Sequence, residues 1–430
     1  NVQIQDSNRI LYADLAKQIP DSNKVILSGS VRMYEQSDSL ECDKLIIRKY
    51  EDNTYYAIGN VILKDSLRII YGDTLFIEYK NDLLKRLNVK SNAMIYSKQY
   101  WEKDSEKKVF QDKMEGQSIL IDFDTNEQID FIEISGMAAA NFTILKNDII
   151  KGINEVSGDS MLIYFLDNNI NTMEVLGGVI GEFTPDKENK NISYPVLYTA
   201  AHINYNLKSE KTILTNNAKV EYGETTLKGG EIEADLNLNL VESKLMDSIF
   251  PSVSSGSESP TYGNYMIFDL ETETGNIEDG YNKIDMGIFR GDDFLTDKDE
   301  NVYIDNAIFT SCDLDEPHYH FGSQKMKIIN SKEQIVGRPM ILYIQDFPAL
   351  SLPLTILPNS NKESKSGFIM PSFGHSRKYG TWIQDFGYYY APNDYYDLLT
   401  YIDFYDKSKF RMETIINYKK LYGPKWYNYK

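Results

Sequence analysis

The sequence predicts an all-β protein, in which an elongated β-jelly-roll or β-sandwich of repeated strand pairs is followed by a second group of longer strands. Three observations predict this fold class. A short unit with alternating apolar residues recurs through the first half of the 430 residues, and no helical period interrupts it. The 32 tyrosines are typical of a strand-rich chain. From Ser366 onward the pattern changes to strands of roughly ten residues separated by short polar turns.

Each repeat begins with a small residue, which a polar residue and then alternating apolar residues usually follow. The clear copies are GDTLFIEY from Gly72, GQSILIDF from Gly116 and GDSMLIYF from Gly158, and looser copies begin at Ala13, Cys42, Ala200 and Gly229. Between them lies a second element, a turn followed by a strand with small residues, as in SGSVRMY from Ser28. Stacking seven such units gives an elongated pair of sheets with a long apolar interior.

Alternation within the three clear copies gives each strand one apolar face. Glu78 and Asp122 lie on the opposite face. A continuous apolar interior built in this way is either a packed core or an open groove that holds alkyl chains, and periodicity alone does not separate the two. The residues expected to line it are Leu75, Ile77, Tyr79, Ile119, Ile121, Phe123, Met161, Ile163 and Phe165.

The segment FTSCDLDEPHYHF, residues 309–321, holds one of two cysteines and two of four histidines. Cys312, His318 and His320 lack the paired spacing of a four-ligand zinc site, and nothing else in the chain supports a cysteine nucleophile. The acidic run from Asp297 lacks the glycine and glutamate of a calcium loop. We therefore expect no catalytic residue, no metal site and no cofactor. Cys42 fills the small-residue position of its repeat, which predicts a buried structural role.

The charge balance argues against nucleic acid as a partner. The chain has 45 basic and 64 acidic residues, a net charge of −19, and no run of lysine and arginine that could follow a phosphate backbone. An anionic ligand must then be held by apolar burial or by a local cation. No apolar run is long enough for a transmembrane helix, which needs about 18 residues or more. The start at Asn1, without Met or an apolar signal, suggests a trimmed N-terminus.

The strands after Ser366 combine an apolar face with a charged face and carry tyrosines at their ends. In residues 397–404 Leu398, Ile402 and Phe404 alternate with Asp397 and Asp403. Repeated over successive strands of this length, such a pattern is typical of an outer-membrane β-barrel. About four strands fit, with a fifth beginning at Lys425, whereas the smallest barrels have about eight, so the sheet is expected to continue beyond the chain given.

This division predicts two domains. Residues 1–357 are expected to form the β-jelly-roll domain, with a linker-like Ser/Gly/Pro loop at 250–263, and residues 358–430 the first strands of a barrel.

The order of these segments resembles the LptD (also called OstA or Imp) family of outer-membrane lipopolysaccharide-assembly proteins. The resemblance rests on the β repeats, then FTSCD and PHYHF, then ILYIQDFPALSLPLTILP, then SKSGFIMPSFGHS and GTWIQDFGYYYAPNDYYDL. It covers essentially the whole chain, weakly in the OstA-like repeats and more specifically in the last 120 residues.

The resemblance implies a non-enzymatic transport function. Acyl chains of lipopolysaccharide pass through the jelly-roll interior in the periplasm, and the glycolipid leaves through a lateral gate of the barrel in the outer membrane. Pro371 matches a gate position, and proline cannot donate a hydrogen bond to a strand ladder. Cys312 matches a cysteine that forms a disulfide with a cysteine near the C-terminus of the barrel. The implied partners are an LptA-like periplasmic bridge protein and an LptE-like plug lipoprotein.

Two alternatives remain open at this point. A soluble periplasmic bridge or scaffold explains residues 1–335 but not the strands after Ser366. A β-helical polysaccharide-active enzyme needs a column of carboxylates or a calcium site along one face, and the repeats offer neither.

Overall fold

The computed structural model describes residues 2–418 except 6–8, 21–22, 50–52, 82, 104–105, 147–148, 167–168, 188, 190–191, 236, 257–258, 285–286, 300, 315, 330, 332–333, 346, 354, 359–365, 370, 379, 394–395 and 408–409. Over these residues the regular structure is strand, and no α-helix occurs, which confirms the all-β prediction. The chain divides into two compact units, unit 1 (Asn1–Thr272) and unit 2 (Glu273–Lys430).

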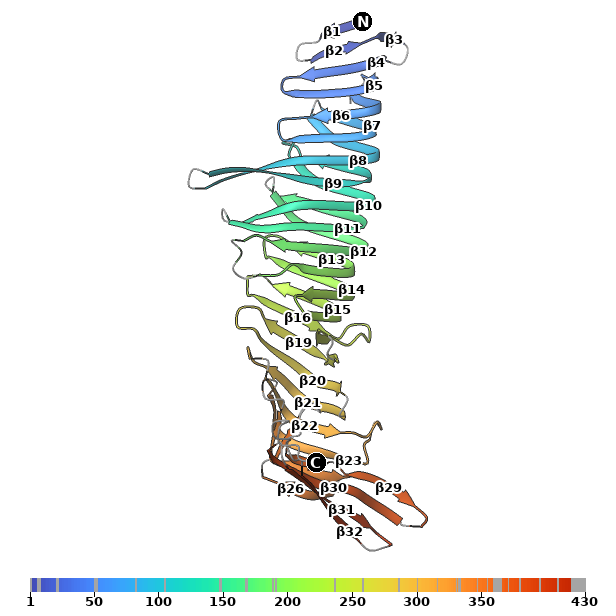
Figure 1. The fold of residues 1–430 in the computed structure, drawn as a ribbon. Coiled ribbons are helices and arrows are strands. Elements are labelled where there is room, and N and C mark those ends of the chain that lie inside the picture. Colours follow the sequence, from blue (N-terminus) through green and yellow to red (C-terminus); the bar gives the residue numbers. More distant parts are fainter. Residues whose placement is uncertain are drawn as a thin grey trace, which may run out of the picture. The chain divides into compact units, whose positions relative to one another are not determined.

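Unit 1 is a stack of antiparallel strands that follow one another in nearly sequential order (Figure 1). Its strands are β1 (Val2–Gln5), β2 (Arg9–Ala13), β3 (Leu15–Ile19), β4 (Lys24–Glu35), β5 (Asp38–Arg48), β6 (Thr54–Lys64), β7 (Arg68–Lys80), β8 (Leu83–Lys103), β9 (Glu106–Phe123), β10 (Ile129–Lys146), β11 (Ile149–Leu166), β12 (Asn169–Pro185), β13 (Val196–Asn206), β14 (Lys211–Tyr222), β15 (Thr225–Asp235), β16 (Leu240–Lys244), β17 (Ser252–Ser255), β18 (Thr261–Tyr262) and β19 (Tyr265–Asp269).

A bulge bends every second strand at the same level of the stack. Two residues with positive φ stand opposite one residue of the next strand, and the ladder register shifts there. Such a bulge bends its strand, so the chain folds back into two facing sheets. We call them wing A (for example residues 31–42, 61–72 and 93–116) and wing B (44–58, 74–90 and 118–135). The positive-φ pairs are Gly29–Ser30, Gly59–Asn60, Ser91–Asn92, Gly136–Met137, Gly177–Gly178 and Asn216–Asn217.

The small residue that opens each repeat lies at this bend because the wings meet there. A Cβ atom added to Gly72 would lie 2.4 Å from Val89 Cγ1, and one added to Gly116 would lie 2.6 Å from Ile134 Cγ2. The polar residue that follows the small one faces the bulge, as where Asn60 Nδ2 donates to Asp43 Oδ2 at 3.0 Å. We call this bend, with its bulge and its small residue, the corner. The repeat recognised in the sequence therefore marks successive corners of the chain.

The segment expected to be a linker-like loop, 250–263, contains the short strands β17 and β18. Residues 252–255 of β17 pair with residues 225–228 of β15, and β17 pairs with β18.

Unit 2 begins with antiparallel strands that repeat the small residue and the Asn–Asp contact of the unit 1 bend, but the register of β21 (Gly287–Thr296) on β22 (Val302–Thr310) stays constant there, without the two-against-one bulge. Asn306, with φ of 48°, donates from Nδ2 to Asp292 Oδ2 at 2.7 Å, and Gly291 fills the small-residue position. The strands are β20 (Thr274–Ile284), β21 (Gly287–Thr296), β22 (Val302–Thr310), β23 (Tyr319–Ile329), β24 (Gln334–Arg338), β25 (Met340–Ile344), β26 (Phe347–Leu352), β27 (Thr355–Pro358), β28 (Gly367–Ile369), β29 (Ser372–Ser376), β30 (Gly380–Asn393), β31 (Tyr396–Tyr405) and β32 (Arg411–Tyr418).

The last strands form a separate antiparallel sheet within unit 2. β28 and β29 both pair with β30, which pairs with β31, and β31 pairs with β32. This confirms the change of strand pattern after Ser366, while the fifth strand expected from Lys425 lies outside the described residues. Over the described residues, no helix has the length and apolar character needed to cross a membrane.

Candidate functional site: the apolar interior of unit 1

The nine residues expected to line the interior lie in three columns that run across the strands of wing B. Leu75, Ile119 and Met161 belong to the first column, which continues through hydrogen-bonded neighbours from β4 to β15. Each of its members is no more than 3% exposed. The twelve residues are Leu27, Leu45, Ala57, Leu75, Val89, Ile119, Ile134, Met161, Val175, Ile203, Leu214 and Ile232.

The second and third columns hold the other predicted residues. Ile77, Ile121 and Ile163 belong to the second column, where Ile121 pairs with Ile132 and Ile132 pairs with Ile163. The third column, at the free edge of wing B, is Tyr79, Leu84, Phe123, Ile129, Phe165 and Ile170. Phe123 is buried there, whereas Tyr79 and Phe165 are partly buried against the core. The interior is thus a dry core near the corner and becomes accessible toward its edge.

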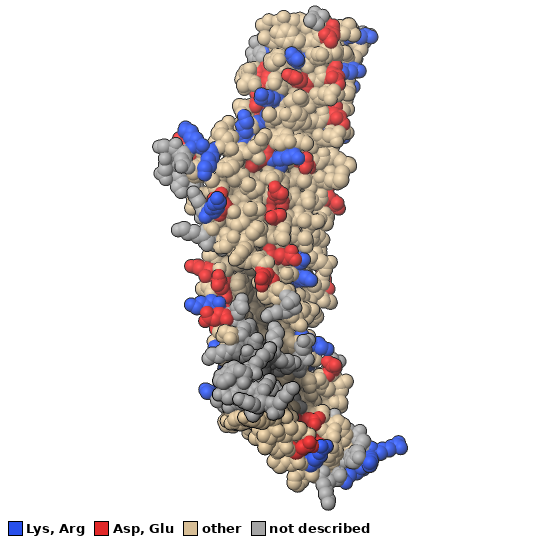
Figure 2. Space-filling view, viewed as in Figure 1, with Lys and Arg blue, Asp and Glu red and all other residues tan. Residues whose placement is uncertain are grey.

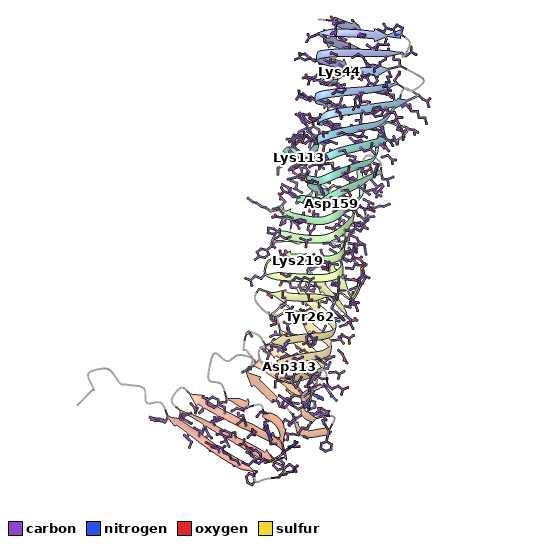
Figure 3. All side chains as sticks on the ribbon, turned by 90° about the vertical axis from the view of Figure 1, so that its right-hand side faces the viewer. Lys44, Lys113, Asp159, Lys219, Tyr262 and Asp313 are labelled. Atoms are coloured by element: carbon purple, nitrogen blue, oxygen red, sulfur yellow. The ribbon has the colours of Figure 1, made fainter. Side chains whose placement is uncertain are left out.

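Polar side chains occupy the outer face, as the alternation predicts. Arg86 Nε and Nη2 donate to Asp122 Oδ1 and Oδ2 at 2.6 and 2.8 Å. This hydrogen bond lowers the pKa of Asp122. Polar side chains recur along the outside of unit 1, as at Lys44, Lys113 and Asp159 (Figure 3). On the face seen in Figure 2, acidic and basic side chains are interspersed over a largely uncharged surface.

A charged cluster lies at the edge of the interior beside β2. Arg9 Nε donates to Glu35 Oε2 at 2.7 Å, and Arg9 Nη1 donates to the Tyr55 hydroxyl. The guanidinium carbon lies 5.4 Å from the ring centroids of Tyr55 and Tyr79. Burial opposes the charge, but the hydrogen bond to Glu35 and the nearby tyrosines leave the pKa of Arg9 raised overall. Burial also raises the pKa of Tyr79 to about 12. We call these four residues the rim cluster.

A depression of about 530 Å³ lies at the corner and not in the apolar interior. None of the nine predicted residues lines it. Its lining is Lys90, Ser91, Asn92, Gln117, Ser118, Ser135 and Gly136.

The cysteine–histidine segment does not gather its three candidate ligands. Cys312 Sγ lies 3.7 Å from His318 Nδ1, whereas His320 stacks on Tyr343 with ring centroids 4.8 Å apart. Within the described ranges, no three His, Cys, Asp or Glu side chains come together as a metal site. Cys312 is a free, partly exposed thiol and Cys42 a free, buried one.

Pro371 interrupts the outer strand of the C-terminal sheet. Ile369 pairs with Gly387 and Ser372 pairs with Gln384, so β28 and β29 keep one register on β30. Pro371, which lies between them, belongs to neither strand and has no N–H to donate to the ladder. At the matching position of β30, Asp385 has φ of 64° and its N–H donates to Asp403 Oδ1 at 2.9 Å.

The two faces of this sheet differ in polarity, as the alternation predicts. Asp397 and Asp403 are buried on one face, and Asn417 Nδ2 donates to Asp397 Oδ1 at 2.7 Å. On the other face large apolar side chains are exposed without cover from the described residues. They include Tyr388, Tyr390, Ile402, Phe404, Met412 and Ile416.

Comparison with known proteins bears on this C-terminal part first. A family model described as LptD protein matches residues 335–425, which include β25 to β32. The LPS-assembly protein LptD of Nitrosomonas eutropha is 26% identical over 182 residues, 42% of this chain and 24% of that relative. In these parts the chain is similar to LptD proteins.

Further proteins to which the chain is similar carry the same name. The LPS-assembly protein LptD of Bordetella avium is 26% identical over 189 residues, 43% of this chain and 23% of the relative. That of Cupriavidus pinatubonensis is 32% identical over 103 residues, 24% of this chain and 12% of the relative. The alignments with the first two span about a quarter of those relatives' length. The all-β fold and the similarity to LptD proteins fit an outer-membrane protein.

Proposed function

We propose that this chain takes part in lipopolysaccharide transport and assembly at the outer membrane, and that the interior of unit 1 carries the acyl chains. The relatives are named as LPS-assembly proteins. The observation that supports this route is the apolar lining of the interior, in which the second and third columns continue the twelve apolar positions of the first column toward the free edge of wing B. Alkyl chains suit such a surface, whereas sugars and phosphates lose hydration there.

The nine residues predicted to line the interior lie at different depths in it. Tyr79, Phe123 and Phe165 border the accessible edge, while the first column lies at the dry corner. We propose that acyl chains lie along the second and third columns while the wings separate at their free edges. The corner column then keeps the wings joined.

We also propose that residues 1–357 form an OstA-like domain in the periplasm and residues 358–430 the first strands of a transmembrane β-barrel. The exposed apolar face of β30 to β32, opposite buried Asp397 and Asp403, supports the second assignment. On this proposal Pro371 belongs to a lateral gate, since it leaves the outer strand with a gap in its ladder.

The proposed partners are lipopolysaccharide, an LptA-like bridge protein and an LptE-like plug lipoprotein. Cys312 is proposed to form a disulfide with a cysteine outside this chain, which its free, partly exposed thiol would permit. The proposed role is assembly and transport, not catalysis, and the relatives' name, LPS-assembly protein, supports it.

One observation favours a second candidate, a scaffold whose interior is only packed core. The first column is almost fully buried between the wings. A protein of this kind would hold other components in place and contact no acyl chain.

Depletion of the protein in the bacterium that produces it tests the proposed function. We expect lipopolysaccharide to accumulate inside the cell and to decrease at the surface, measured by labelling its sugars on intact cells. Re-expression from a plasmid is the control and restores surface labelling. Unchanged surface lipopolysaccharide after complete depletion would contradict the proposal.

A further inference from the structure

The rim cluster joins the two wings of unit 1. Arg9 and Glu35 are register partners on β2 and β4, in wing A. Tyr55 and Tyr79 lie in wing B, where Tyr55 pairs with Ile77 and Ile47. The Arg9 side chain therefore contacts residues of both sheets.

The contact is made across the interior and not along one sheet. β2 and β7 are separated by β4, β5 and β6 in the ladder. Four strand spacings amount to about 19 Å, which exceeds the reach of an arginine and a tyrosine side chain together. Yet the Arg9 guanidinium carbon lies 5.4 Å from the Tyr79 ring centroid. Because the registers place Arg9 in wing A and Tyr79 in wing B, this contact crosses from one wing to the facing wing.

The cluster lies where the interior opens. Tyr79 heads the third column at the free edge of wing B, and the next positions of that column, Leu84, Phe123 and Ile129, are apolar and offer no side-chain donor or acceptor. The Arg9 side chain is 24% exposed and the Glu35 side chain 29% exposed, so the ion pair borders both water and the core. In this half-dry setting a charge-assisted hydrogen bond is stronger than on an open surface.

We propose that the rim cluster is a latch: it holds the wings together across the open edge at the N-terminal end of unit 1, and its release admits an alkyl chain from the side. This inference rests on the proposed function for the use of the interior, but the latch itself is a property of the two wings. Glu35 positions the guanidinium, and the two tyrosine rings receive it.

Spin labels at the tips of the wings measure the latch directly. Ser37, in the turn between β4 and β5, marks wing A, and Lys80, at the end of β7, marks wing B; both are exposed. The labels are attached to Ser37→Cys and Lys80→Cys in a Cys312→Ser background, in the whole chain kept soluble by amphipol. Cys42 remains, since it is buried. We expect electron–electron resonance to give a longer and broader distance distribution for Arg9→Ala than for the parent.

Arg86→Ala is the matched control. It removes an arginine–carboxylate pair of the same unit, with Arg86 Nε 2.6 Å from Asp122 Oδ1, but this pair lies within wing B on the outer face. The distance distribution is expected to remain that of the parent. Glu35→Gln provides a second latch variant that keeps the side-chain size, and it decides the question if Arg9→Ala does not fold.

The rate of alkyl-chain entry supplies a second readout. A fluorescent long-chain fatty acid is expected to associate about tenfold faster with Arg9→Ala than with the parent, because the charge-assisted hydrogen bonds of Arg9 no longer hold the wings together. The final occupancy is expected to be similar in both. Parent-like distances and rates in both Arg9→Ala and Glu35→Gln would overturn the latch. If no variant takes up the probe, the proposed function fails, whereas the label distances still decide whether the wings are latched.

Discussion

Asp112 and Asp122 belong to the same strand, β9, but their environments shift their pKa values in opposite directions. Asp112 is 4% exposed, and its carboxylate accepts hydrogen bonds from the Thr143 N–H at 3.0 Å and Gln99 Nε2 at 2.7 Å. Burial outweighs these bonds and raises the pKa of Asp112. The Asp112 carboxylate accepts the Thr143 N–H where the pairing of β9 with β10 ends, so this backbone donor is not left without a partner. The hydrogen bonds to Asp112 offset part of the free-energy cost of burying its carboxylate.

The opposite shifts predict opposite pH dependences of stability. The folded state holds the Asp112 proton to higher pH than the unfolded chain does, so Asp112 contributes less to the free energy of unfolding as the pH rises from about 4 to 7. Asp112→Asn lacks this titration, so we expect the difference in free energy of unfolding, variant minus parent, to increase as the pH rises over that range. Urea unfolding at several pH values, followed by circular dichroism, measures it.

Asp122→Asn is the control of opposite sign. Its folded pKa is lowered by Arg86, so its contribution is present above the unfolded pKa of about 3.9 and is lost as the pH falls through the folded value. A partly exposed pair of this kind contributes about 0.5–1 kcal/mol. The free energy of unfolding of Asp122→Asn should therefore be lower than that of the parent at pH 7, and this difference should disappear below about pH 4. Trends of the same sign in the two variants would refute this assignment.

Individual residues also show which features of the fold the sequence predicts and which it does not. The alternation placed the nine predicted residues on the inner face of their strands because each strand has one dry side, but it did not separate the fully buried first column from the partly buried Tyr79 and Phe165. The corner formed by Gly136 and Met137 was missed, since Met is not a turn residue although it has φ of 54° there. The copy at Gly291 was missed too, although GDDF follows the pattern of GDTL. The Arg9–Tyr55 contact joins residues 46 positions apart and depends on the fold-back of the wings, which no local pattern contains.

At the scale of elements, the corner explains why unit 1 tolerates different residues in the small position. Gly72, Gly116 and Gly158 each face a β-branched side chain at a distance that leaves no room for a Cβ atom. By the same register Cys42 faces Ala57, the smallest member of the first column, so a thiol fits there. Burial raises the pKa of Cys42 to about 11, which keeps it protonated and unreactive at neutral pH.

The interrupted outer strand of the C-terminal sheet was predictable from Pro371, but its constant register was not. β28 and β29 stay in line because β30 spans both of them.

Replacing Pro371 by valine restores a backbone donor at the gap. We expect Pro371→Val to join β28 and β29 into one strand and to slow amide hydrogen exchange over residues 380–390 by about tenfold, since one added backbone hydrogen bond contributes about 0.5–1.5 kcal/mol. Mass spectrometry of peptic fragments measures this. Pro392→Val, in β30 but beyond the residues that pair with β28, is the control and should leave exchange unchanged. Equal exchange in Pro371→Val and the parent would show that the proline does not weaken the ladder.

At the scale of the whole molecule, charge and apolar burial act against each other on an anionic glycolipid. The net charge of −19 repels it, but salt screens surface charges beyond about 8 Å at physiological ionic strength. Each methylene that leaves water contributes about 0.8 kcal/mol, so a chain of about twelve contributes roughly 10 kcal/mol. Binding by burial therefore prevails, and a glycolipid with several chains suits such a protein better than a small hydrophilic anion.

Photo-crosslinking in a cell that makes lipopolysaccharide tests the central claim most directly. A photoreactive amino acid is placed at Ile121 or Ile163, which are 1% exposed within the interior, and at Asp122, which faces outward. We expect crosslinks to lipopolysaccharide from Ile121 and Ile163 and none from Asp122. No crosslink from either interior position, in a folded protein at normal abundance, would mean that the interior is only a packed core and would contradict the proposed route.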